Sequence, residues 1–197
     1  MGKVKLTVYC LTYNHEKYIQ QTLESFLKQR TKYNFKIIVH DDASTDNTQR
    51  IIKEYAEQYP EIIKAILQKE NQFSKGINVV EQFILPEIEG DYIATCEGDD
   101  YWIDECKLEK QIDFLEMHNE YSACVHNSIF YNMKTGEKKA FNSNITNAKD
   151  IKLADIIEGV NGVFHTSSVV YRKEIAFQKY DFLKCMKGVG DYPKAIL

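Results

Sequence analysis

The sequence is poor in the features that mark several classes of protein. It has no apolar run near the about 20 residues that cross a bilayer and no cluster of basic residues. Lysine and arginine total 25 against 29 acidic residues, so the formal net charge is −4. A membrane-spanning chain and a DNA or RNA binder are both disfavoured.

Cysteine is present, but not in a pattern that binds metal or forms a disulfide framework. The number of cysteines is odd, and no C-x-x-C pair occurs among Cys10, Cys96, Cys106, Cys124 and Cys185. The first residues carry neither the apolar core of a signal peptide nor a myristoylation motif. We therefore expect a cytoplasmic protein, with peripheral contact at the inner face of the membrane as an open alternative.

Apolar runs and helical periodicities alternate along the first hundred residues. Short β-branched runs at 5–10, 35–40, 63–67 and 91–96 predict strands, and the segments 18–28, 48–59 and 78–85 have helical spacing, the last stopped by Pro86. Almost continuously apolar strands separated by amphipathic helices are typical of a mostly parallel sheet with helices on both faces. The predicted fold class is α/β.

The alternation loosens after residue 100. The pattern predicts a helix over 107–118, a strand over 122–130, a hairpin turn at 134–137, a short helix over 151–158 and a strand over 167–171. No internal repeat, low-complexity tract or linker composition occurs. We expect one domain over residues 1–197.

Polar residues, many of them acidic, follow three of the predicted strands. Because the carboxyl ends of parallel strands share one edge of a sheet, these residues should lie close together. Converging carboxylates repel unless a cation lies among them, and hard oxygen ligands select Mg²⁺ or Mn²⁺. A bound divalent cation in turn indicates that the protein binds an anionic ligand such as a diphosphate. The three groups are Thr12-Tyr13-Asn14, Asp41-Asp42 and Asp99-Asp100.

Each group also has a simpler interpretation. Asp46 fits a helix cap better than a ligand, and Asp41-Asp42 fits a solvated turn as well as a site. Tyr13 is placed to stack on a base, although tyrosines beside strands are often core residues. Asp99-Asp100, two adjacent acids after a buried strand, are costly unless something pairs with them.

The ordered motifs resemble the nucleotide-sugar-binding half of a family 2 glycosyltransferase with the GT-A fold. The resemblance covers the first 130 residues well and continues more weakly through 165–168 and 190–192. The segment Glu97–Trp102, with Lys107-Leu108 downstream, is similar to bacterial members that build surface polysaccharides. The motifs that carry it are Thr12-Tyr13-Asn14, 41–46, and Gly90-Asp91-Tyr92-Ile93 leading into 97–100.

The resemblance implies a role for each matching residue. Thr12, Tyr13 and Asn14 would contact the nucleoside, with Asp41 beside them and Asp42 at the base edge. Lys75 lies where the family often has a phosphate contact, although a solvated lysine fits as well. Asp99 would face the ribose or donor sugar, Asp100 would ligate Mn²⁺ or Mg²⁺, and Asp191 would be the catalytic base.

The implied activity is inverting, metal-dependent transfer of a sugar from a nucleotide diphosphate sugar, with UDP expected, to a saccharide or lipid-linked acceptor. Residues 1–130 would form the nucleotide-sugar-binding half, and 131–197 an acceptor-side half that is incomplete at its C-terminus. The sequence leaves open the donor sugar, the acceptor, the choice between Mn²⁺ and Mg²⁺ and the oligomeric state.

A non-catalytic nucleotide-sugar or carbohydrate-binding module remains an alternative. A Mg²⁺-dependent phosphoryl-transfer or receiver-type domain is a second, weakened by the lack of a Walker glycine loop.

Overall fold

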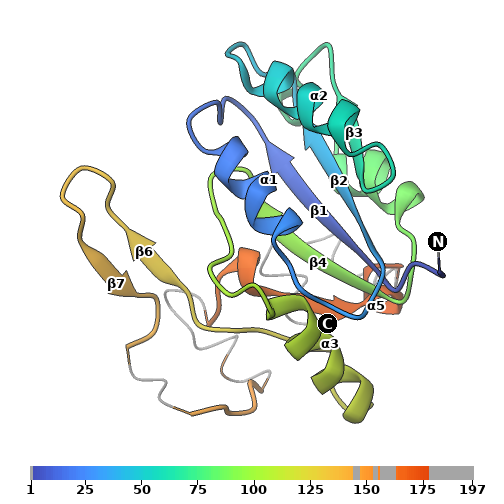
Figure 1. Ribbon diagram of the computed structural model, residues 1–197, viewed down its shortest axis with the longest axis vertical. Coiled ribbons are helices and arrows are strands. Elements are labelled where there is room, and N and C mark those ends of the chain that lie inside the picture. The colour runs from blue at the N-terminus through green and yellow to red at the C-terminus, as the bar shows by residue number, and fades with distance from the viewer. Residues whose placement is uncertain (1, 144–146, 153–154, 156–162, 178–197) are drawn as a thin grey trace.

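A six-stranded sheet forms the centre of the molecule (Figure 1). The computed structural model describes residues 2–143, 147–152, 155 and 163–177. The strand order is β3-β2-β1-β4-β8-β5. Most of the helix predicted at 151–158, and all of 188–197, lie outside the described residues.

Four of the strands are parallel, as the alternating pattern predicted. They are β1 (Leu6–Thr12), β2 (Phe35–Asp41), β3 (Ile63–Leu67) and β4 (Tyr92–Glu97). Two short antiparallel strands, β8 (Val170–Arg172) and β5 (Ala123–Cys124), extend the sheet beyond β4. Because β8 lies between β4 and β5, a strand from the second half of the chain is built into the sheet of the first.

Three amphipathic helices cover one face of the sheet. They are α1 (Ile19–Leu27), α2 (Thr48–Gln58) and α3 (Lys107–Met117). Their apolar stripes, including Leu23, Ile52 and Ile112, pack on Val8 and Ile37 of the sheet and form the larger core. The 3.6-residue spacing in the sequence therefore identified the buried face of each helix.

The opposite face is covered by less regular structure. The predicted helix at 78–85 is a π-helical turn, η2 (Val80–Ile84), followed by the 3₁₀ turn η3 (Leu85–Glu87). The helical turn η2 ends at Ile84, before Pro86, as predicted. The chain then passes through Pro86 in η3, in whose first turn the missing N–H leaves no hydrogen bond unmade. The short helix α5 (Lys173–Phe177) packs on the same side.

Two predicted strands are broken in the structure. The segment 122–130 divides between β5 and β6 (Ile129–Tyr131), and β6 pairs with β7 (Lys138–Ala140) in a separate hairpin that projects from the main sheet (Figure 1). The hairpin turn predicted at 134–137 is confirmed. The segment 167–171 begins as the 3₁₀ turn η4 (Thr166–Ser168) before β8.

The strand order reverses between β1 and β4. From β1 the chain builds outward to β2 and β3, then crosses to the other side of β1 to form β4. In open α/β sheets such a switch point leaves a crevice outside the carboxyl ends of the strands. Here the two strands that flank the switch point end at Thr12 and Glu97.

Candidate active site

The loops after β1 and β2 brace one another. The hydroxyl of Ser44 accepts a hydrogen bond from the amide of Asn14 at 2.8 Å, and the Asn14 side-chain oxygen accepts one from the amide of Thr45 at 2.8 Å. Asn14 and Ala43 both have positive φ, 56° and 64°. Such conformations cost energy for residues with a Cβ and cluster at functional sites.

Asp41 organises this pair of loops from beneath. It is fully buried, and its carboxylate accepts hydrogen bonds from Thr12 Oγ1 at 2.8 Å, from Gln49 Nε2 at 2.7 Å, and from both the amide and the hydroxyl of Ser44. These four donors occupy the lone pairs that a carboxylate offers. Asp41 therefore shapes the loops, and the direct nucleotide contact predicted for it does not fit its burial.

Asp42 holds a third loop against the end of β2. Its two carboxylate oxygens accept hydrogen bonds from the amides of Gln72 at 2.8 Å and Phe73 at 3.0 Å, at the start of the 3₁₀ turn η1 (Phe73–Lys75). Lys75, at the end of that turn, is paired with Glu70 on the surface. The residues predicted to contact the base edge and a phosphate, Asp42 and Lys75, thus lie in one loop system that Asp42 organises.

The acidic tip after β4, residues 98–100, packs tightly against the loop after β1. A Cβ on Gly98 would lie 2.7 Å from His15 Nδ1 and 2.8 Å from Thr12 Cγ2, so only glycine fits without movement. From α1, the Thr22 hydroxyl lies 2.7 Å from the carbonyl oxygen of Asp100 and 3.0 Å from that of Gly98. The structure therefore brings the predicted residues of strands β1, β2 and β4 to one edge.

The carboxylates of this tip retain free oxygens. Asp99 is exposed, and neither of its carboxylate oxygens has a hydrogen-bond partner among the described residues. Asp100 is about one-third exposed; its Oδ2 accepts a 2.5 Å hydrogen bond from Ser167 and lies 3.6 Å from His165 Nδ1, which leaves Oδ1 available. Oxygen donors of this kind fit Mg²⁺ or Mn²⁺. Over the described part of the chain no group of three or more potential ligands occurs, and Mg²⁺ commonly uses only one or two carboxylates together with phosphate oxygens.

Ser167 and Lys107 are two residues near the tip for which the sequence analysis gave no role. Ser167 lies in the polar run 165–168. The position of this run directly before a strand was the one feature of the sequence that could have indicated a functional role. Lys107 is 3% exposed, its Nζ lies 4.2 Å from the centre of the Trp102 ring, and this Nζ has no hydrogen-bond partner among the described residues. Burial lowers the pKa of Lys107 to about 7.

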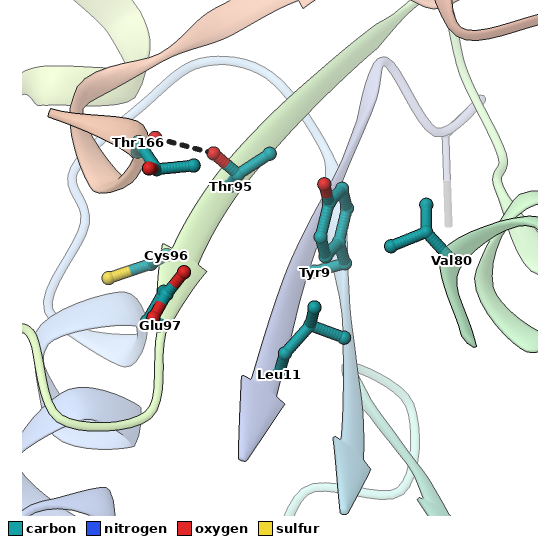
Figure 2. Close-up of a pocket in the computed structure, with 7 residues that line it drawn as sticks. All are labelled: Tyr9, Leu11, Val80, Thr95, Cys96, Glu97 and Thr166. Atoms are coloured by element: carbon teal, nitrogen blue, oxygen red, sulfur yellow. Dashed lines mark hydrogen bonds between the residues drawn. The ribbon is translucent and has the colours of Figure 1, made fainter. Parts of the chain in front are cut away.

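A small pocket lies beside the tip on the face covered by η2 (Figure 2). Tyr9 and Leu11 of β1 and Thr95 and Glu97 of β4 line it, with Val80 opposite. Its volume is about 50 Å³. Ligand pockets are typically about 300–1,000 Å³, so this pocket is too small to hold a nucleotide.

The remaining predicted residues divide into three cases. Asp46 accepts hydrogen bonds from the amide of Thr48 at 2.9 Å and its hydroxyl at 2.5 Å. It lies one residue before Asn47, the N-cap position of α2, so it supports the start of the helix without being its N-cap. Burial alone would raise the pKa of Asp46, but the hydrogen bonds from Thr48 and the Glu16 amide outweigh it and lower the pKa. Tyr13 is 46% exposed beside Asn14, and Asp191 lies outside the described residues.

A doubly wound sheet with an acidic tip at its switch point is the architecture of GT-A nucleotide-sugar enzymes. The chain belongs to Glycosyl transferase family 2, whose family profile matches residues 7–177. The resemblance noted in the motifs is thereby confirmed.

Relatives match the chain over part of their length. The uncharacterized protein Rv1520 of Mycobacterium tuberculosis is 35% identical over 173 residues, 87% of this chain and 48% of the relative. The putative glycosyltransferase EpsE of Bacillus subtilis is 42% identical over 117 residues, 59% of this chain and 40% of EpsE. The chain spans about half or less of the length of these curated relatives.

A solved structure supports the same fold. S. aureus TarS 1-349 in complex with UDP is 26% identical, with a TM-score of 0.62, covering 87% of this chain and 48% of TarS. It has also been solved with UDP-GlcNAc, where the TM-score is 0.61. No helix in the described part of this chain has the length and apolar character to span a bilayer.

Proposed function

We propose that this chain binds a UDP-linked sugar with Mn²⁺ or Mg²⁺ and transfers the sugar, with inversion, to a hydroxyl of a saccharide or lipid-linked acceptor. The observation that carries the proposal is the Asp99-Asp100 tip. Its carboxylates have oxygens without partners among the described residues, and it lies at the switch point, where open α/β sheets bind their ligands. The UDP and UDP-GlcNAc complexes of TarS support a uridine nucleotide as donor.

The loops after β1 and β2 would hold the nucleoside. In the proposed arrangement the exposed ring of Tyr13 stacks on the base, with Thr12 and Asn14 beside it. Asp42, which already accepts two amides, offers its remaining lone pairs to the base edge. Lys75 exchanges its surface pairing with Glu70 for a phosphate oxygen.

The acidic tip and the base would serve the transfer itself. Asp99 faces the ribose or donor sugar, and Asp100 Oδ1 is the oxygen offered to the cation. When bound, the cation stabilises negative charge on the leaving diphosphate. Asp191 takes the proton of the acceptor hydroxyl as that oxygen attacks the anomeric carbon, and such help is typically worth about 10²–10⁴ in rate.

The test is UDP binding with and without metal. UDP should raise the melting temperature because it binds only the folded chain, and Mn²⁺ or Mg²⁺ should enlarge the shift. Asp100→Asn should remove the enlargement and keep the metal-free shift. Equal stabilisation by UDP in excess EDTA would contradict the role of Asp100.

Turnover separates an enzyme from a binding module. UDP release from a UDP-sugar, alone and with saccharide acceptors, should fall at least about 10²-fold in Asp191→Asn while UDP binding is retained. UDP binding without turnover by the unaltered chain would favour a non-catalytic module. Trapping of an acyl phosphate analogue such as beryllofluoride, without UDP stabilisation, would favour a phosphoryl-transfer domain.

A further inference from the structure

Ser167 makes hydrogen bonds to three residues in and beside the acidic tip. Its hydroxyl donates to Asp100 Oδ2 at 2.5 Å and accepts from the amide of Glu97 at 3.1 Å. Its carbonyl oxygen accepts from the indole N–H of Trp102 at 2.8 Å. The residue is 6% exposed, so water competes little for these groups.

The two bonds of the Ser167 hydroxyl determine its orientation. A serine hydroxyl has a single proton to donate. Because the Glu97 amide occupies a lone pair of Oγ, the proton is directed to Asp100. Oδ2 of Asp100 is thereby held, and Oδ1 is the oxygen without a partner among the described residues.

The turn η4 that carries Ser167 is itself fixed to the sheet. All three carbonyl oxygens of η4 accept side-chain hydrogen bonds, from Thr95 at 2.6 Å, Trp102 at 2.8 Å and Gln111 at 2.9 Å. Figure 2 shows the first of these, between β4 and η4. Ser167 therefore contacts Asp100 from a rigid support.

We propose that Ser167 is a positioning residue for Asp100, whose hydroxyl fixes one carboxylate oxygen so that the other is presented to the divalent cation. The inference rests on the proposed function. Hydrogen-bond partners of metal-binding carboxylates orient them, and their loss typically costs about 10–100-fold in metal affinity. The donor site would then require residues 163–172 as well as the first 130.

The adjacent serine provides a matched control. Ser168 is fully buried, and its hydroxyl donates to the carbonyl oxygen of His165 at 2.6 Å without contacting Asp100. Ser168→Ala thus removes one buried hydroxyl and one hydrogen bond from the same turn. Ser167→Ala also removes one buried hydroxyl, and with it both the bond to Asp100 and the bond from the Glu97 amide.

The experiment measures Mn²⁺ binding to the UDP-bound chain by the EPR signal of free Mn²⁺, together with UDP affinity in EDTA. Ser167→Ala should weaken Mn²⁺ binding about 10-fold or more and change metal-free UDP affinity less than about twofold. Ser168→Ala should change neither. Ser167→Cys, which fills the space with a weak donor, should shift Mn²⁺ binding in the same direction as Ser167→Ala, and it replaces that variant if the alanine form does not fold.

The outcomes are distinguishable. Equal weakening by Ser167→Ala and Ser168→Ala would overturn the inference, because general loosening of η4 would then be the cause. Unchanged Mn²⁺ binding in the Ser167 variants, with a loss in Asp100→Asn, would overturn the positioning role and leave the proposed function intact. Unchanged Mn²⁺ binding in Asp100→Asn would overturn both.

Discussion

The hydroxyl of Thr12 donates a 2.8 Å hydrogen bond to the buried carboxylate of Asp41, and the two residues are also partners in the parallel register of β1 and β2. The last residues of two neighbouring strands are thus joined at the edge of the sheet where the loops begin. The same carboxylate accepts from Ser44 and Gln49, so one side chain sets the start of both loops.

Asp41→Asn should lower the free energy of unfolding by at least about 2 kcal/mol. An amide has a single acceptor oxygen, so some of the four donors to Asp41 would be left without a partner, and each stranded buried donor costs about 1–3 kcal/mol. UDP binding should weaken as well, because the loops lose their support. Urea unfolding measures the first effect and UDP titration the second; a loss below about 0.5 kcal/mol would contradict the structural role.

Asp46→Ala should separate support of the start of α2 from ligand binding. Loss of the hydrogen bonds at the start of α2 should lower the free energy of unfolding by about 0.5–2 kcal/mol. Metal-dependent UDP binding should stay unchanged, because Asp46 serves the helix. Abolished UDP binding with unchanged stability would place Asp46 in the site instead.

The elements found from the sequence are those with strong local periodicity. The strands at 35–41 and 63–67 are built on short, mostly apolar runs, and α1 to α3 carry apolar residues at helical spacing, so the hydrophobic pattern alone identifies them. The convergence of Thr12, Asp42 and Asp99 follows from parallel strands, because their carboxyl ends share an edge.

Long-range contacts decide the features that the sequence did not predict. The residues 167–168 have strand character, yet they lie in η4, where their carbonyl oxygens accept hydrogen bonds from the side chains of Trp102 and Gln111. In 122–130 the pairing of β5 with β8 ends at Cys124, and the chain then leaves the sheet. Ser167 stood 67 residues from Asp100, a separation at which no local pattern indicates a contact.

Gly98→Ala should disturb the site more than the fold. The new Cβ would meet His15 and Thr12 below 3 Å, so the acidic tip and the loop after β1 must separate. Such overpacking typically costs about 1–3 kcal/mol, and we expect UDP affinity to fall about 10-fold. The control is Gly136→Ala, where φ is +74° and no atom lies within 4 Å of the added Cβ.

The Gly136 variant should lose about 1–2 kcal/mol from backbone strain and keep its UDP affinity. Isothermal titration with UDP and chemical unfolding of both variants compare the two effects. Equal UDP affinity in the Gly98 and Gly136 variants would show that the tip and the loop do not cooperate in binding.

Lys107 should make stability depend on pH in a specific direction. Burial lowers the pKa of Lys107 from 10.5 in the unfolded chain to about 7 in the folded one. Between these pH values the unfolded chain binds more protons, so this lysine makes the free energy of unfolding rise with pH, and below about pH 7 its destabilising effect is complete.

Lys107→Met keeps an apolar side chain of similar length over Trp102 and removes the titrating group. At one pKa unit per about 1.4 kcal/mol, the variant should be more stable by about 3–5 kcal/mol at pH 7, and the difference should shrink steadily toward pH 10. Lys110→Met is the control, since Lys110 lies on the same helix, exposed and paired with Asp104. Urea unfolding of the three proteins from pH 6.5 to 9.5 gives the slope of the free energy of unfolding against pH for each. The contributions of the other titrating groups cancel when these slopes are compared. If unfolding free energies of the unaltered chain and Lys107→Met ran parallel over this range, Lys107 would keep an ordinary pKa, and its charge would have to be solvated in the folded chain.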